Sequence, residues 1–336
     1  MAKQRGRLQT DLEYAAVRLL LGGLGLLPRR ASVAMGRALG HAAYALAGGL
    51  RRTGRRNLEL AFPEMGAEQR QRILRGTFQS LGRLLGEFAQ LPRATAESMR
   101  AYVEYSPDSV RLYHEALARG KGVIFLTSHL GAWEVLSFAQ SVFDVPLSFL
   151  VRPIDNPRVE ELVERFRTRL GNRPIDKKAA ARTALRVLRD GGTLGILADL
   201  NTQAHEGVFV PFFGRLACTT TSVAVLALRT DAVVMPSHAT WDRARGRYVL
   251  HCDPPLELIR TGDLERDVSE NTGLFASVIE RQIREHPDQW LWIHKRWKTR
   301  PAGEPDLYGK DGVKELTESK APPSQEPALS TKPQKF

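Results

Sequence analysis

Short apolar runs alternate with amphipathic stretches through the middle of the chain. Residues 122–128 (GVIFLTS) form a β-branched apolar run between a glycine and a polar Ser-His pair, which predicts a buried strand. The next residues, 131–143, have the apolar spacing of a helix. Strand and helix patterns alternate in this way over 122–240, which predicts an α/β fold with a mainly parallel sheet flanked by helices.

The other elements follow from the same two periodicities. Further strands are predicted at 145–153, 193–199, 231–242 and 247–258, and further helices at 57–101, 109–119, 159–170, 181–190, 218–230 and 267–286. Residues 304–336 are rich in Pro, Lys, Ser and Glu without an apolar face, and are predicted to be a disordered tail. The α/β domain would lie between the first 56 residues and this tail, at 57–303.

Charge and apolar residues gather together at the start of the chain. The 336 residues carry a formal charge of +12, and residues 1–56 hold eleven Lys or Arg but only two acids. Two apolar stretches, 15–28 and 41–50, lie in the same region and are too short for a confident membrane span, which needs about 20 apolar residues. We interpret residues 1–56 as a helical region that associates with an anionic membrane surface, with an ordinary solvated helical pair as the alternative.

The candidate chemistry lies just after the first predicted strand, in the segment HLGAWE at 129–134. His129 would stand at the carboxyl end of the strand, where open α/β sheets place their sites. A neutral imidazole can remove a proton from a hydroxyl, and Glu134 on the first or second turn of the following helix could orient it. Gly131 permits close approach of the backbone to a substrate, and N–H groups from Gly131 onward could stabilise an oxyanion.

Several segments in this order resemble one family of enzymes. SHLGAWE (128–134), RPIDNP (152–157), VFVPFFG with ACTTTSVAVLALRT (208–230) and QWLWIHKRWKTRP (289–301) are similar to the motifs of the bacterial lipid A biosynthesis acyltransferases. A further segment, RRNLELAFPEM (55–65), resembles the part of the family that follows its amino-terminal anchor. These late lauroyl and myristoyl transferases lie within the glycerolipid acyltransferase superfamily, which has a His-x4-Asp/Glu motif.

The resemblance implies a reaction and a set of roles. An acyl group would move from a thioester, on acyl carrier protein or coenzyme A, to a hydroxyl of a membrane glycolipid, most simply a lipid A precursor of lipopolysaccharide biosynthesis. His129 would be the general base, Glu134 its support, and Arg152 a contact to phosphate on donor or acceptor. No metal or cofactor is implied, because a thioester is already activated. The enzyme would act at the cytoplasmic face of the inner membrane.

Two more residues are candidates for substrate binding. Asp199 ends the strand at 193–199 and could contact the acceptor or support His129, or it could simply cap a loop. Glu206 keeps the Glu-Gly pair of the superfamily's third motif, with a structural role in its loop as the alternative. The arginine that follows this pair in the superfamily is absent here, where Val208 and Phe209 stand, and His205 occupies a position that is basic in several relatives.

Three other functions fit parts of the sequence. A related acceptor such as a phosphatidylinositol mannoside would use the same motifs. A nucleic-acid-binding protein would explain the basic charge, but the chain has no recognisable nucleic-acid motif. An ester hydrolase would need a Gly-x-Ser-x-Gly elbow, which is absent, although Ser128 precedes His129. The two cysteines, Cys218 and Cys252, form no metal-binding pattern.

Overall fold

The core of the molecule is one seven-stranded sheet, described here from a computed structural model that covers residues 6–142, 147–150, 154–175 and 180–309. The strand order is β1-β9-β8-β2-β5-β3-β4, and all neighbours are parallel except β8 and β9. This confirms the predicted α/β architecture. The strands are β1 (Val103–Tyr105), β2 (Val123–Thr127), β3 (Ser148–Leu150), β4 (Arg173–Ile175), β5 (Thr193–Leu197), β8 (Val233–Asp242) and β9 (Arg247–Cys252).

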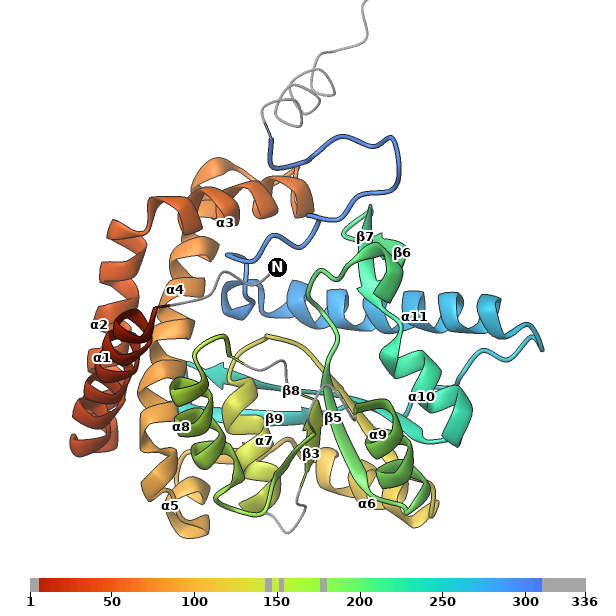
Figure 1. Ribbon diagram of the computed structural model, residues 1–336, viewed down its shortest axis with the longest axis horizontal. Helices are drawn as coiled ribbons and strands as arrows, with labels where there is room; N and C mark the ends of the chain where they lie inside the picture. Colours follow the sequence, from red (N-terminus) through yellow and green to blue (C-terminus); the bar gives the residue numbers. More distant parts are fainter. Residues whose placement is uncertain (1–5, 143–146, 151–153, 176–179, 310–336) are drawn as a thin grey trace, which may run out of the picture.

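Helices cover both faces of this sheet (Figure 1). Strand β2 is buried along its whole length, which explains its continuous apolar run. Its side chains alternate: Ile124 and Leu126 pack with the helices of one face, whereas Val123 and Phe125 pack with the other. One face carries α9 (Ala180–Arg189), α10 (Ser222–Thr230) and α11 (Leu264–Glu285), and the other carries α6 (Ser109–Ala118), α7 (Trp133–Val142) and α8 (Pro157–Thr168).

The amino-terminal helices stand beside the sheet as a separate group at the left of Figure 1. The amino-terminal group comprises α1 (Arg7–Leu26), α2 (Arg29–Leu46), α3 (Gly48–Ala61) and the long α4 (Ala67–Gln90). The short remaining elements connect the layers. The connecting elements are η1 (Leu91–Arg93), α5 (Ala96–Arg100), η2 (Ala204–Glu206), the hairpin β6 (Gly207–Phe212) and β7 (Arg215–Thr220), and η3 (Pro287–Gln289).

Several predicted boundaries differ from the structure. The helix predicted at 57–101 is divided among α3, α4, η1 and α5, and the strand predicted at 247–258 ends at Cys252. The helix predicted at 218–230 begins only at Ser222, because Cys218, Thr219 and Thr220 pair with β6 as the end of β7. Threonine is β-branched and favours such a strand over a helix. Residues 304–309, which were predicted as the start of the tail, are part of the folded structure, since Leu307 is buried and the Tyr308 hydroxyl donates a hydrogen bond to Asn57. Residues 310–336 lie outside the described part.

No helix in the described part of the chain is both long enough and apolar enough to span a bilayer. Buried contacts hold the amino-terminal helices to one another. Glu87 on α4 is 1% exposed and forms a two-bond ion pair with Arg29 of α2, whose Nε lies 2.9 Å from Oε2. The Arg29 guanidinium also lies 3.5 Å from the centre of the Tyr102 ring. Breaking this contact would leave a buried carboxylate unpaired, which costs several kcal/mol, about 3–5.

Helices α2 and α4 approach so closely that only glycine fits at their crossing. A Cβ atom added at Gly36 would lie 2.2 Å from the carbonyl oxygen of Gly82, and one at Gly40 would lie 2.3 Å from that of Phe78. Both obstacles are backbone atoms, so relief would require the helices to separate. The two helices therefore pack backbone to backbone through these glycines.

Because α2 and α4 pack so closely, a methyl group added at Gly40 should destabilise the protein, whereas one added at Gly23 should not. Gly40→Ala should lower the free energy of unfolding by about 1–3 kcal/mol, as overpacking does, despite the better helix propensity of alanine. Gly23→Ala in α1, where an added Cβ meets nothing within 4 Å, should be neutral or stabilising. Denaturant unfolding of both variants measures the difference. Equal free energies of unfolding for the two variants would contradict the close packing of α2 against α4.

Candidate active site

The sheet register places two site residues side by side. Thr127 of β2 pairs with Leu197 of β5, so the residues two positions further on, His129 and Asp199, leave the sheet at the same edge. This is the carboxyl end of the parallel strands, where the sequence predicted the site. Strand β8 runs along the other side of β2. The site is therefore central in the sheet.

His129 is held by Asp199 through two hydrogen bonds. The Nδ1 atom of the imidazole lies 2.9 Å from Oδ1 of the carboxylate, and the backbone N–H of His129 donates to Oδ2 at 2.9 Å. The His129 side chain is 18% exposed while that of Asp199 is fully buried. An aspartate that binds Nδ1 fixes the tautomer of the ring, and this leaves Nε2 as the atom that can accept a proton.

A third donor completes the surroundings of Asp199. The indole N–H of Trp290, a fully buried side chain, donates to Oδ2 at 2.7 Å. Burial by itself raises the pKa of the Asp199 carboxyl, but the charge and hydrogen bonds of His129 and the Trp290 N–H outweigh it, so the pKa lies below its ordinary value. Asp199 is therefore ionised at neutral pH and stabilises a protonated His129.

The turn between His129 and α7 differs from its predicted role. Gly131 has φ = +63°, and a Cβ there would lie 2.0 Å from the carbonyl oxygen of Ala239. The backbone of β8 therefore requires glycine here, and a role for Gly131 beside a substrate stays a prediction. The N–H of Gly131 donates to the carbonyl of Gln289 at 2.9 Å, and that of Ala132 donates to Ala239 at 2.8 Å. Both groups are occupied, so neither is available to an oxyanion in this structure.

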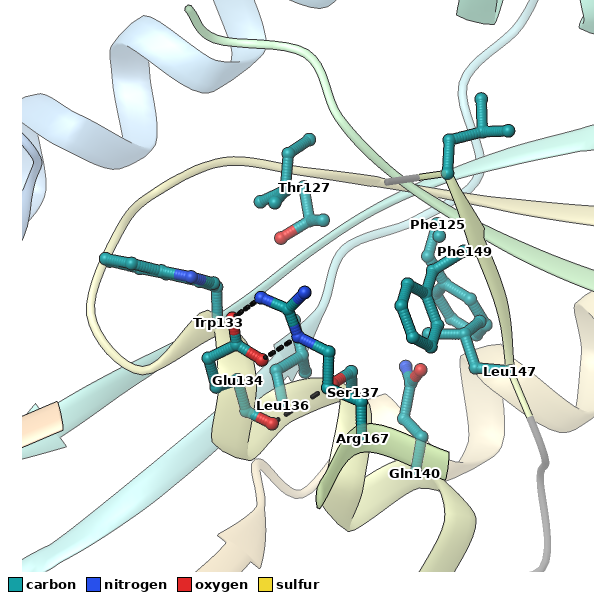
Figure 2. Close-up of a pocket in the computed structure, with 13 residues that line it drawn as sticks. Phe125, Thr127, Trp133, Glu134, Leu136, Ser137, Gln140, Leu147, Phe149 and Arg167 are labelled. Atoms are coloured by element: carbon teal, nitrogen blue, oxygen red, sulfur yellow. Dashed lines mark hydrogen bonds and ion pairs between the residues drawn. The ribbon is translucent and has the colours of Figure 1, made fainter. Parts of the chain in front are cut away.

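Glu134 lies on the first turn of α7, as predicted, but it is paired with a different residue. Arg167 of α8 grips its carboxylate with two N–H groups, Nε lying 3.0 Å from Oε2. Figure 2 shows this pair at the edge of a pocket. Among the described residues, the structure shows no hydrogen bond between Glu134 and His129. The carboxylate that binds Nδ1 of His129 in this structure is that of Asp199, and a catalytic role for Glu134 stays a prediction.

The pocket beside this ion pair is mainly apolar. Phe125, Leu147 and Phe149 gather opposite Glu134 and Arg167 in Figure 2. Trp133 joins the pocket to the histidine, since it lines the pocket and its ring centroid lies 5.1 Å from that of His129. The remaining lining residues are Thr127, Leu136, Ser137, Gln140, Leu150, Gly195 and Leu197.

The other predicted site residues lie elsewhere. Glu206 is in η2 and accepts a hydrogen bond from the Thr202 hydroxyl at 3.1 Å, which suits a role within its loop. Arg152 falls outside the described residues. Ser128 is fully buried, which argues against its use as a nucleophile in ester hydrolysis. The described residues also contain no cluster of His, Cys, Asp or Glu able to hold a metal ion.

A histidine base backed by a buried aspartate, beside an apolar pocket at a sheet edge, suits transfer of a hydrophobic group to a hydroxyl. The chain belongs to the bacterial lipid A biosynthesis acyltransferase family, whose sequence profile matches residues 3–299. It is therefore an acyltransferase, as the sequence predicted.

Named relatives agree with this assignment. The chain is 29% identical over 266 residues to the lipid A biosynthesis lauroyltransferase of Escherichia coli K12, covering 75% of this chain and 80% of the relative. It is 27% identical over 255 residues to the palmitoleoyltransferase of the same organism, covering 76% and 80%. It is 23% identical over 291 residues to the myristoyltransferase, covering 86% and 87%.

Proposed function

We propose that this enzyme transfers a fatty acyl group from a thioester, on acyl carrier protein or coenzyme A, to a hydroxyl of a lipid A precursor. The observation that carries the proposal is the His129–Asp199 pair beside an apolar pocket. His129 takes the proton of the acceptor hydroxyl on Nε2, and Asp199 stabilises the imidazolium that forms. Family membership and the names of the relatives support the choice of a lipid A acceptor.

The reaction needs only a base and an oxyanion site. The hydroxyl oxygen attacks the thioester carbon as its proton passes to His129, and the tetrahedral intermediate then loses the thiolate, which takes the proton back. The first-turn N–H groups of α7 at Trp133 and Glu134 are candidates for the oxyanion donors, since the N–H groups of Gly131 and Ala132 are occupied. Arg152 stays a prediction as a contact to phosphate on donor or acceptor.

The apolar pocket is the proposed site of the acyl chain. It is narrow in this structure, about 70 Å³, so a chain enters only as the lining side chains rotate outward. The carboxylate of Glu134 and the guanidinium of Arg167 neutralise each other at its edge. Gly195 of β5, which pairs with Phe125, lines the pocket four residues before Asp199 and so marks its deep end.

A substitution at this deep end should change the preferred chain length. Gly195→Val adds methyl groups at a point where even a Cβ would lie 2.9 Å from the Leu147 side chain. We expect preference to move to shorter acyl donors, by roughly 10–200-fold per excluded methylene, as in other apolar pockets. Competition between thioesters of different length measures this. An unchanged preference in a folded variant would place the chain elsewhere.

The Trp290 indole should tune the pH dependence of transfer. Trp290→Phe keeps an aromatic ring but removes the N–H that stabilises ionised Asp199, so the pKa of Asp199 rises and its hold on protonated His129 strengthens. We expect kcat/KM to fall about tenfold, the effect of one hydrogen bond to a charged group, and the acid limb of its pH profile to move to higher pH.

The matched control is Trp292→Phe. Trp292 is equally buried, but its N–H donates to the carbonyl of Pro287 at 2.6 Å. Trp292→Phe should leave the pH profile of kcat/KM unchanged. Equal shifts in both variants would show that Trp290 acts only through packing.

The amino-terminal helices are the proposed membrane-binding surface, at the cytoplasmic face of the inner membrane. Among the described residues, nine of the thirteen exposed large apolar side chains lie before residue 57, in about a sixth of the chain. They are Leu8, Leu12, Leu19, Leu20, Leu26, Met35, Leu39, Leu46 and Leu50. Such leucines beside arginines suit helices that lie on a bilayer. Failure of the protein to sediment with vesicles of phosphatidylglycerol would contradict this.

Analysis of cellular lipids tests the proposed acceptor. Mass spectrometry of cells lacking the protein should show lipid A species that lack one acyl group, restored by the wild-type gene and not by a His129→Ala gene. Loss of an acyl group from a phosphatidylinositol mannoside, with lipid A unchanged, would instead favour the alternative acceptor.

A further inference from the structure

A second cavity lies among the amino-terminal helices. It measures about 360 Å³ and is lined by Tyr44 near the end of α2, Arg55 of α3, and Ala67, Arg70 and other residues of the first two turns of α4. It shares no lining residue with the apolar pocket near His129. In Figure 1 the helices that form it stand at the upper left, where α3 meets α4.

Of the arginines in the RRTGRR segment, 51–56, Arg55 is the one that lines the cavity. Arg51 donates to the carbonyls of Tyr44 and Ala45 at 2.7 and 2.8 Å, and Arg56 is buried with a hydrogen bond to the carbonyl of Leu307. Those two arginines hold the fold together. Arg55 is exposed, lines the cavity, and has no hydrogen bond or ion pair to any described residue. Its guanidinium is therefore available to a ligand.

The cavity is lined by two arginines and two glutamates. Arg70 donates to the carbonyl of Phe62 at 3.0 Å, so Arg55 is the lining arginine whose guanidinium has no partner among the described residues. Guanidinium groups match phosphate oxygens in pairs. Glu59 and Glu68 line the cavity too, with Glu59 lying 3.9 Å from Arg56. Carboxylates there suit a headgroup that carries hydroxyl or amino donors beside its phosphate.

The cavity opens next to an apolar corner. Leu46, the last residue of α2, is 85% exposed and Leu50, in the first turn of α3, is 43% exposed. This corner joins α2 and α3, the helices that contribute Tyr44 and Arg55 to the cavity. A corner inserted among acyl chains would bring Arg55 to the level of the lipid phosphates.

We propose that this cavity, between α2, α3 and α4, binds the phosphate headgroup of a membrane phospholipid and so fixes how the enzyme sits on the bilayer. The inference rests on the proposed function only in placing the enzyme at a membrane, and its test needs no turnover. The ligand is a resident lipid of the membrane, separate from the acyl acceptor.

The test is sedimentation of the full-length protein with vesicles of phosphatidylcholine alone or with phosphatidylglycerol added. Ala67→Trp fills the cavity without changing charge, and Arg55→Gln removes its unpaired guanidinium. Each should weaken the phosphatidylglycerol-dependent part of binding by roughly tenfold, as for loss of a charge-assisted hydrogen bond. Arg189→Gln is the control, since Arg189 is an exposed residue at the end of α9, on the other side of the molecule from α3 (Figure 1). It should bind as the wild type does.

The experiment distinguishes a specific lipid-binding site from electrostatic attraction that is spread over the protein surface. If Arg55→Gln and Arg189→Gln weaken binding equally, or if Ala67→Trp binds normally, the attraction is spread over the surface and the cavity is not the site. Thermal melts confirm that each variant is folded. Titration with inorganic phosphate without vesicles is a further arm: binding as tight as that to phosphatidylglycerol vesicles would overturn the assignment to a lipid.

Discussion

His129→Ala is expected to lower the turnover number by roughly 10²–10⁴-fold, the usual contribution of a positioned general base. The hydroxyl of a sugar or acyl chain is a weak nucleophile, and the structure leaves Nε2 of His129 as the atom that takes its proton. The loss should appear in kcat at saturating donor and acceptor, because binding of both substrates uses other residues. The measurement is steady-state transfer by purified protein.

His129→Gln is a useful companion variant, since it keeps a polar side chain of similar size but no base. A thermal melt close to that of the wild type shows that the fold survives. Full transfer activity in either folded variant would remove His129 from the reaction.

Asp199→Asn is expected to lower kcat by a similar amount, roughly up to 10⁴-fold, as the equivalent change does in a Ser-His-Asp triad. An amide at this position can offer its own N–H to Nδ1, which turns the imidazole into the wrong tautomer. The carboxylate also accepts N–H groups from the His129 backbone and from Trp290, so two buried donors lose a charged partner. The double variant with His129→Ala should be no worse than His129→Ala alone, because the two residues act as a unit.

Glu134→Gln serves as the comparison, because the structure links Glu134 to Arg167 and not to the histidine. Its effect should match that of Arg167→Gln, and the double variant should show much less than the sum of the two losses. Additive losses for Glu134→Gln and Arg167→Gln, together with coupling between Glu134 and His129, would restore the role that the sequence assigned to Glu134.

The sequence predicted the sheet edge more reliably than the contacts made there. Strand β2 is buried on both faces, so its apolar run and the position of His129 after it could be read directly. The choice between Glu134 and Asp199 could not, because it depends on the turn at 130–132. Hydrogen bonds to Ala239 and Gln289, more than a hundred residues away, set that turn.

The same limit applies to the residues that the sequence missed. Trp290 contacts Asp199 only because the chain after α11 pairs with Leu130, a contact without any local pattern. The threonines at 219 and 220 lie next to a helical pattern and were assigned to it, whereas pairing with β6 makes them a strand. Local periodicity therefore defines the elements, and long-range packing decides which polar groups meet.

Acyl transfer to a lipid hydroxyl can be measured directly with purified protein. Purified protein is incubated with an acyl thioester and a lipid A precursor, and both the lipid mass and the released thiol are followed. We expect the lipid to gain one acyl group in place of a hydroxyl hydrogen, matched by one thiol released, and neither change to occur with His129→Ala. Release of thiol without an acylated lipid, or no reaction with any thioester donor, would contradict it.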